Sequence, residues 1–161
     1  MAGNKKTRWV VREGHSIEVD EETSARMAGV RQKDTKPEQI VRRIVTRLGH
    51  RYRLQNKELP GRPDLANRSK KWVIFVHGCF WHRHPGCRLA TTPKRNAEFW
   101  QAKFDRNVAR DQRAVEDLEA LGYTVMTIWE CETRNLDRVV HSLRTQLDEI
   151  ASRHDRRTRE R

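Results

Sequence analysis

This sequence contains no long apolar run. A helix that crosses a membrane needs about 18 to 20 consecutive apolar residues, and no stretch approaches that length. The polar first six residues also lack the apolar core of a secretory signal peptide. The sequence therefore excludes a membrane-spanning protein, and we expect the chain to stay in the cytoplasm.

Cysteine is scarce, and the number of cysteines is odd. Only Cys79, Cys87 and Cys131 occur, and histidines cluster beside the first two. Unpaired thiols near imidazoles in a cytoplasmic protein favour metal binding over disulfide bonds.

Acidic residues are too few to balance the basic ones. The chain of 161 residues has 34 Lys and Arg against 22 Asp and Glu, which gives a formal charge of +12. A surface of this kind favours a polyanion, and nucleic acid is the usual partner. A basic face that only contacts solvent is the alternative. The length fits one domain with terminal extensions, and no internal repeat is present.

One stretch concentrates the chemically reactive side chains. The apolar run from Trp72 to Val76 is typical of a buried strand, and Gly78 ends it. Two thiols, three imidazoles and two large aromatic rings follow between residues 77 and 87. Such a cluster in a sequence of which 35% is charged indicates a functional site.

The remaining pattern predicts an α/β sandwich, in which helices flank a mixed central sheet. Helices are expected from about 36 to 48, 96 to 121 and 135 to 152, because apolar residues recur there at helical spacing. Strands are expected at 52–55, after the turn that delivers Asp64, at 72–76 and at 123–129. Residues 1–22 are interpreted as a weakly ordered, flexible extension, 23–36 as a basic arm and 153–161 as a disordered tail.

The three cysteines can meet at one edge of the predicted sheet. Cys79 and Cys87 follow the central strand, and Cys131 follows a strand that could be its neighbour. Three thiolates and one imidazole would complete a tetrahedral zinc site, with either His82 or His84 as the fourth ligand. The other histidine could then face a substrate. The alternative is three buried, inert cysteines.

A carboxylate interrupts the apolar face of the long predicted helix. Asp111 falls between Val108 and Val115 on the stripe that also includes Trp100 and Phe104. It must therefore be paired, face a functional cleft or lie at the margin of the core.

Taken together, these motifs resemble the very short patch repair (Vsr) mismatch endonucleases, over residues 23–150. The motifs are Leu59-Pro60-Gly61-Arg62-Pro63-Asp64, Val73-Ile74-Phe75 leading to His77–His82, Glu98-Phe99-Trp100, Asn107-Val108 with Arg110-Asp111, and Trp129-Glu130-Cys131. The resemblance implies a restriction-endonuclease-like fold. It also implies nicking of DNA on the 5′ side of the T in a T:G mismatch, which deamination of 5-methylcytosine produces.

The resemblance assigns a role to each matching position. It implies that Asp64 and the main-chain carbonyl of Val76 bind Mg²⁺, although the family can have Thr at the second position. It gives His82 the catalytic role, with His77, Asp111 and the nearby acid Glu38 in support. The implied structural zinc ligands are Cys79, His84, Cys87 and Cys131. The implied DNA contacts are Phe80, Trp81 and Trp100 as wedges into the base stack, and Met27, Arg26, Arg31 and Lys33 on the N-terminal arm.

Elementary chemistry agrees with this resemblance. Phosphodiester hydrolysis needs an activated water and stabilised phosphate charge, and Mg²⁺ on oxygen ligands supplies both. Histidine side chains can accept a proton near neutral pH, and a mismatched base step costs less to unstack. We expect a monomer in the bacterial cytoplasm, associated with the nucleoid, that acts on double-stranded DNA containing a T:G mismatch and works with mismatch-repair proteins. A restriction-type nuclease for unmodified DNA and a non-catalytic mismatch-binding protein are the alternatives.

Overall fold

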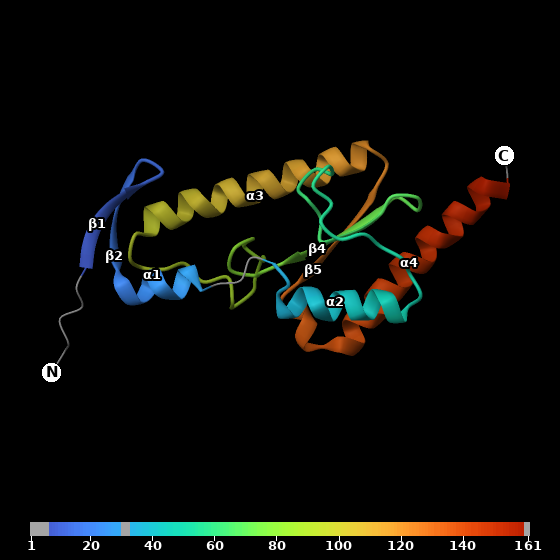
Figure 1. Cartoon of the computed structure of the whole chain (residues 1–161), viewed down its shortest axis with the longest axis horizontal. Coiled ribbons are helices and arrows are strands. Elements are labelled where there is room, and N and C mark those ends of the chain that lie inside the picture. The colour runs from blue at the N-terminus through green and yellow to red at the C-terminus, as the bar shows by residue number, and fades with distance from the viewer. Residues whose placement is uncertain (1–6, 30–32, 160–161) are drawn as a thin grey trace.

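The computed structural model describes residues 7–29 and 33–159 and places a small central sheet between helices (Figure 1). The elements in chain order are β1 (Thr7–Arg12), β2 (His15–Asp20), α1 (Glu21–Ala28), α2 (Lys36–Arg47), β3 (Leu65–Asn67), β4 (Trp72–His77), α3 (Ala97–Ala120), β5 (Thr124–Trp129), the 3₁₀ turn η1 (Glu132–Arg134) and α4 (Leu136–Arg159). None of the described helices is long and apolar enough to cross a membrane.

Strand β4 is the middle strand of the central sheet. It pairs antiparallel with β3, where Leu65 lies opposite Ile74, and parallel with β5, where Trp72 lies opposite Thr124. Parallel neighbours need a long crossover connection, and α3 provides it. The predicted mixed sheet and α/β class are therefore confirmed.

The two faces of β4 enter different cores because successive side chains alternate across a strand. Trp72 and Ile74 pack with α2 and α4, whereas Val73 and Phe75 pack with α3 through Ala114 and other residues. Figure 1 shows α3 on one side of the sheet and α2 with α4 on the other. This arrangement buries β4 on both faces, which explains its continuous apolar sequence.

The start of α2 has the predicted capping signals. Thr35 is the N-cap, and its side chain accepts a hydrogen bond from the Glu38 amide at 3.4 Å. The Thr35 hydroxyl donates in turn to Glu38 Oε1 at 2.8 Å, and Pro37 occupies the first turn. This cap fixes the position of Glu38. The long helix α3 also lies where the sequence predicted it.

The N-terminal segment has more regular structure than we expected. We expected a weakly ordered extension over residues 1–22, but strands β1 and β2 form an antiparallel hairpin from Thr7 to Asp20, and residues 1–6 lie outside the described residues. Glu13 and Gly14 join them with positive φ angles of 52° and 79°, which suits a tight hairpin turn. Ile17 is buried, and the Asn96 side chain exchanges hydrogen bonds with both main-chain groups of Glu18. Tertiary contacts with the start of α3 therefore hold the hairpin.

Two other boundaries differ from the prediction. Residues 52–55 make only a single bridge, between Arg53 and Ala66, and Gln55 adopts a positive φ that an extended strand does not allow. Helix α4 continues to Arg159 in place of the predicted disordered tail from 153. No Gly or Pro after Ser152 interrupts it.

The predicted basic arm is partly helical. Helix α1 contains Arg26 and Met27, and Met27 is 36% exposed. Lys33 is exposed just before α2. Arg31 lies outside the described residues. The interpretation of this segment as a DNA-binding arm stays a prediction.

Candidate active site and metal centre

Both candidate sites lie at one edge of the central sheet. Strands β4 and β5 run parallel, so their carboxyl ends meet at the same edge. The loop after β4 carries Cys79 and His82, and Cys131 follows β5. The Glu130 amide donates to the His77 carbonyl at 2.8 Å and joins the two strand ends.

Four side chains at this edge are arranged as a closed metal site. One ligand atom from each residue lies within 4.8 Å of all the others, and the residues are Cys79, His84, Cys87 and Cys131. His84 Nδ1 lies 3.6 Å from the Cys79 sulfur and 3.3 Å from the Cys131 sulfur. A tetrahedral site with Zn–S bonds of about 2.3 Å and Zn–N bonds of about 2.0 Å separates sulfur from nitrogen by about 3.5 Å. The donor set and its spacing therefore fit a tetrahedral ion.

Neighbouring groups hold these ligands in place. The Trp129 ring stacks on His84 with ring centroids 4.2 Å apart and an angle of 8° between the planes. The Cys79 amide donates to the Glu130 carboxylate at 3.4 Å, and the Leu89 amide donates to the Cys87 sulfur at 3.4 Å. All three cysteines are free thiols. Partners of this kind orient metal ligands and fix the His84 ring.

The geometry separates the roles of the two candidate histidines. His84 belongs to the thiol cluster, whereas His82 turns to the other side of the loop and meets Asp111 from α3. His82 Nδ1 lies 2.5 Å from Asp111 Oδ2. With the proton on Nδ1, the second ring nitrogen of His82 is left as a base. Asp111, which interrupted the apolar stripe, is therefore paired and faces a functional hollow.

His77 lies directly against His82. Their rings stack with centroids 3.9 Å apart and an angle of 9° between the planes. Burial, and after it the neighbouring His82, lower the pKa of His77 to about 4. His77 is therefore neutral at physiological pH. Partial burial opposes ionisation of Asp111, but the hydrogen bond with His82 and the nearby His82, His77 and Arg110 together outweigh it, and the pKa of Asp111 is lowered.

Asp64 enters the same hollow from the start of β3. Its Oδ2 accepts a hydrogen bond from the Val76 amide at 2.7 Å. Burial raises the pKa of Asp64 to about 6 against the effect of that hydrogen bond, and the nearby charge of Glu38 adds to the increase. A bound cation would stabilise the ionised form of a desolvated carboxylate that lies beside a second acid.

The hollow has a volume of about 200 Å³ and gathers all five predicted catalytic residues. Its lining includes Glu38, Asp64, His77, His82 and Asp111, together with Val76. Pairing between β3 and β4 ends at Ile74, so Val76 has no partner residue on β3. Carboxylate and carbonyl oxygens are the ligands that Mg²⁺ prefers. The donor chemistry of Asp64 and Val76 therefore fits this ion.

Glu38 is buried, and its carboxylate is fully engaged. It accepts hydrogen bonds from the Thr35 hydroxyl, the Asp34 amide and the Arg42 guanidinium. The Arg42 to Glu38 distance is 3.0 Å. Glu38 therefore acts on Asp64 through its charge.

The three predicted wedge residues form one half-buried aromatic group beside the hollow. Phe80 contacts Trp81 and Trp100 edge-on, with ring centroids 5.0 and 5.8 Å away. Phe104 lies beneath Phe80, and Lys103 extends over the two indoles at 5.7 Å. None of the three wedge residues belongs to either core cluster. The group presents flat rings and a positive charge at the surface, which suits stacking against bases.

Several supporting residues gave no clear signal in the sequence. Arg42 forms an ion pair with Glu38, and Asn107 donates to the Trp81 carbonyl at 3.1 Å and so ties the loop to α3. Asn107 lies in a recognised motif, but its partner is 26 positions away. The position of Asn107 within the motif could have indicated its supporting role. For Glu38 and Arg42, the i, i+4 spacing on a helix was the only sequence signal that they form a pair.

A neutral histidine, a histidine–aspartate pair and desolvated carboxylates beside an aromatic surface are side chains suited to hydrolysis of a large anionic substrate. Sequence comparison supports this class. The family described as "DNA mismatch endonuclease Vsr" matches residues 17–88.

Individual relatives extend the match over most of the chain. The chain is similar to a type II nicking enzyme, V.XorIIP, of Xanthomonas oryzae, with 45% identity over 122 residues that cover 76% of this chain and 89% of that protein. It is also similar to the DNA mismatch endonuclease Vsr of Escherichia coli, with 37% identity over 123 residues that cover 76% and 78%. A third relative, V.NmeAIP of Neisseria meningitidis, is 40% identical over 109 residues, covering 68% and 77%. The chain belongs to the Vsr family of DNA mismatch endonucleases.

Proposed function

We propose that the protein nicks double-stranded DNA at T:G mismatches, on the 5′ side of the mismatched T, and so starts very short patch repair. The observation that carries this proposal is the hollow that brings Asp64, His77, His82 and Asp111 together beside Phe80, Trp81 and Trp100. We further propose that the sheet and its flanking helices are a restriction-endonuclease-like core. The site at one edge of a mixed sheet supports this assignment.

Mg²⁺ and zinc are the proposed metals. Asp64 and the Val76 carbonyl would hold Mg²⁺, which would supply charge stabilisation at the scissile phosphate and an activated water. The cluster of Cys79, His84, Cys87 and Cys131 would hold structural zinc, because three soft sulfur ligands and one imidazole favour it.

Four side chains have the remaining roles in the proposed reaction. Asp111 holds His82 in one tautomer, so that the free ring nitrogen of His82 takes the proton from the attacking water. Neutral His77 stacks on His82 and fixes the plane of its ring without adding charge. Glu38 keeps the environment of Asp64 negative, which favours a bound cation.

The aromatic group supports mismatch recognition. A weakly paired T:G step opens at lower cost than a matched step, and Phe80, Trp81 and Trp100 would stack against the opened bases. Met27, Arg26, Arg31 and Lys33 would add contacts from the N-terminal arm. Cooperation with mismatch-repair proteins is part of the same proposal.

A nicking assay tests the proposal against its two alternatives. Duplexes with a T:G mismatch, with the matching pair and without methylation would be labelled at each 5′ end in turn and incubated with and without Mg²⁺. The proposal expects one cut, 5′ of the mismatched T, only with Mg²⁺. Equal cutting of matched DNA would favour a restriction-type enzyme, and tight mismatch binding without cutting would indicate a binding protein.

A further inference from the structure

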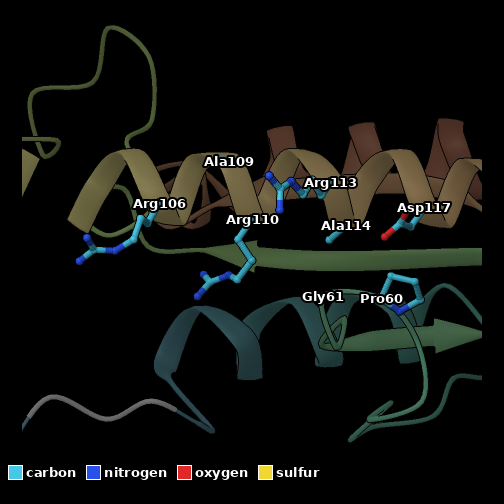
Figure 2. Close-up of a pocket in the computed structure, with 8 residues that line it drawn as sticks. All are labelled: Pro60, Gly61, Arg106, Ala109, Arg110, Arg113, Ala114 and Asp117. Carbon is cyan, nitrogen blue, oxygen red and sulfur yellow. The ribbon is translucent and has the colours of Figure 1, made fainter. Parts of the chain in front are cut away.

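A second hollow lies next to the proposed active site, between α3 and the turn at Pro60 and Gly61. Its volume is about 460 Å³. Three arginines of α3 line it, and Figure 2 shows Arg106 and Arg110 extending from the helix on the side where the turn lies. Asp117 is the single acid in the lining. The hollow therefore carries an excess of positive charge.

The turn is pressed closely against the helix. Gly61 has a φ of +67°, and a Cβ atom there would lie 2.5 Å from Ala114 Cβ and 3.0 Å from the Phe75 ring. Only glycine fits this position, so the wall of the hollow is set by packing. Gly61, Arg110 and Ala114 also line the active-site hollow, and the two hollows therefore adjoin each other.

The arginines are held weakly. Arg106 pairs with Glu13 at the tip of the β1–β2 hairpin, and Arg110 lies 3.2 Å from Asp111. Both arginine side chains are more than half exposed, at 52% and 62%. Arg113 is exposed and makes no ion pair with any residue that the structure describes. Exposed pairs of this kind contribute little energy, so a phosphate can replace the carboxylate partners.

We propose that Arg106 and Arg113 bind backbone phosphates of the DNA strand that continues from the scissile phosphate. This inference rests on the proposed function, since it extends the path of the substrate away from Asp64. Seven residues of helix separate the two arginines by about 10.5 Å along the axis. One DNA strand rises about 3.4 Å per nucleotide along its axis and also winds around it, so neighbouring phosphates lie farther apart than this rise, and the span suits two phosphates about one or two steps apart.

Contacts of this kind position the duplex and carry no sequence information. They therefore predict equal losses of affinity for mismatched and matched DNA. Arg110 is left unchanged in the test because it contacts Asp111 of the catalytic pair.

The test compares two double variants with the same change in charge. Arg106→Gln with Arg113→Gln removes the proposed contacts, and Arg138→Gln with Arg144→Gln removes two exposed arginines of α4. Affinity for T:G and matched duplexes would be measured at several salt concentrations with Mg²⁺ omitted. We expect the first variant to lower the slope of log K against log salt by about 1.8 for both duplexes, since each phosphate contact contributes about 0.9. The control should keep the wild-type slope.

Neutral methylphosphonates, placed one at a time along the cleaved strand, then locate the contacts. In wild type, two positions beside the scissile phosphate should weaken binding, and in the Arg106→Gln, Arg113→Gln variant these positions should have no further effect. An unchanged slope, or losses equal to those of the control, would show a solvated basic face and overturn the proposal. Binding is measured without cleavage. A wild-type protein that binds but fails to nick T:G DNA would therefore refute the proposed function separately.

Discussion

Replacing Asp64 by Asn should stabilise the Mg²⁺-free protein while it abolishes nicking. Asp64 is a desolvated carboxylate whose pKa is raised from 3.8 to about 6. Between pH 4 and 6 the folded state therefore keeps a proton that the unfolded state has lost, and stability falls as the pH rises through this range. Above pH 6 the folded protein bears the full free-energy cost of the desolvated charge. A pKa shift of this size corresponds to about 3 kcal/mol of stability.

Asn removes this charge with almost no change in shape, and its amide oxygen can still accept from the Val76 amide. We expect a gain of about 1–3 kcal/mol at pH 7.5, or roughly 3–10 °C in Tm for a chain of this size. At pH 4.5, just above the ordinary pKa of Asp, the gain should fall to about a third of its value at pH 7.5, and it should vanish only below the pKa of the unfolded state. Mg²⁺ should raise the Tm of wild type and leave the variant unchanged.

Melting curves at both pH values, with and without Mg²⁺, measure these effects beside single-turnover nicking of T:G DNA. Asp117→Asn, at an exposed position of α3, is the matched control and should change neither stability nor its response to Mg²⁺. A destabilised Asp64→Asn protein at pH 7.5, or one that still nicks with Mg²⁺, would refute the reasoning.

Three further predictions concern the zinc cluster, the wedge and the catalytic pair. Cys131→Ser should lower zinc content and Tm together, because it opens a site that links two distant segments; full zinc content at an unchanged Tm would remove Cys131 from the ligands. Trp81→Ala should cost about 1–3 kcal/mol in binding to T:G DNA and lower its preference over matched DNA; an unchanged preference with a collapsed Tm would make Trp81 a core residue. Asp111→Asn should slow nicking by about 10²-fold or more at pH 7 with little loss of DNA affinity, because His82 loses its orienting carboxylate; a wild-type rate would exclude that role.

The sequence predicted the elements in which local signals and tertiary packing agree. The apolar run at Trp72–Val76 is a strand buried on both faces, and Thr35 with Glu38 forms the expected helix start. For Asp111 the sequence left a partner, a functional cleft or the margin of the core as the possibilities for a carboxylate on an apolar helix face, and the structure supplies His82 as its partner. Each of these interpretations depended on a large free-energy cost that the folded protein has to avoid.

The sequence could not predict features that depend on distant contacts. The β1–β2 hairpin has one buried apolar residue, Ile17, and takes its position from Asn96, 78 positions beyond Glu18. Composition alone therefore suggested a flexible segment. From spacing alone, either His82 or His84 could complete the thiol cluster, because the choice depends on how the loop turns after Gly78.

The loop after β4 contributes both to the stability of the protein and to the proposed chemistry. Its local hydrogen bonds, from the His82 amide to the Gly78 carbonyl and from the His84 amide to the Cys79 carbonyl, hold it in tight turns. One side of the loop carries thiol-cluster ligands and the other carries His82, so a closed metal site fixes the position of the proposed base. His82 also depends on Asp111 of α3, which is not one of the cluster residues. The two anchors are therefore complementary: the cluster fixes the main chain of the loop, and Asp111 fixes the imidazole ring.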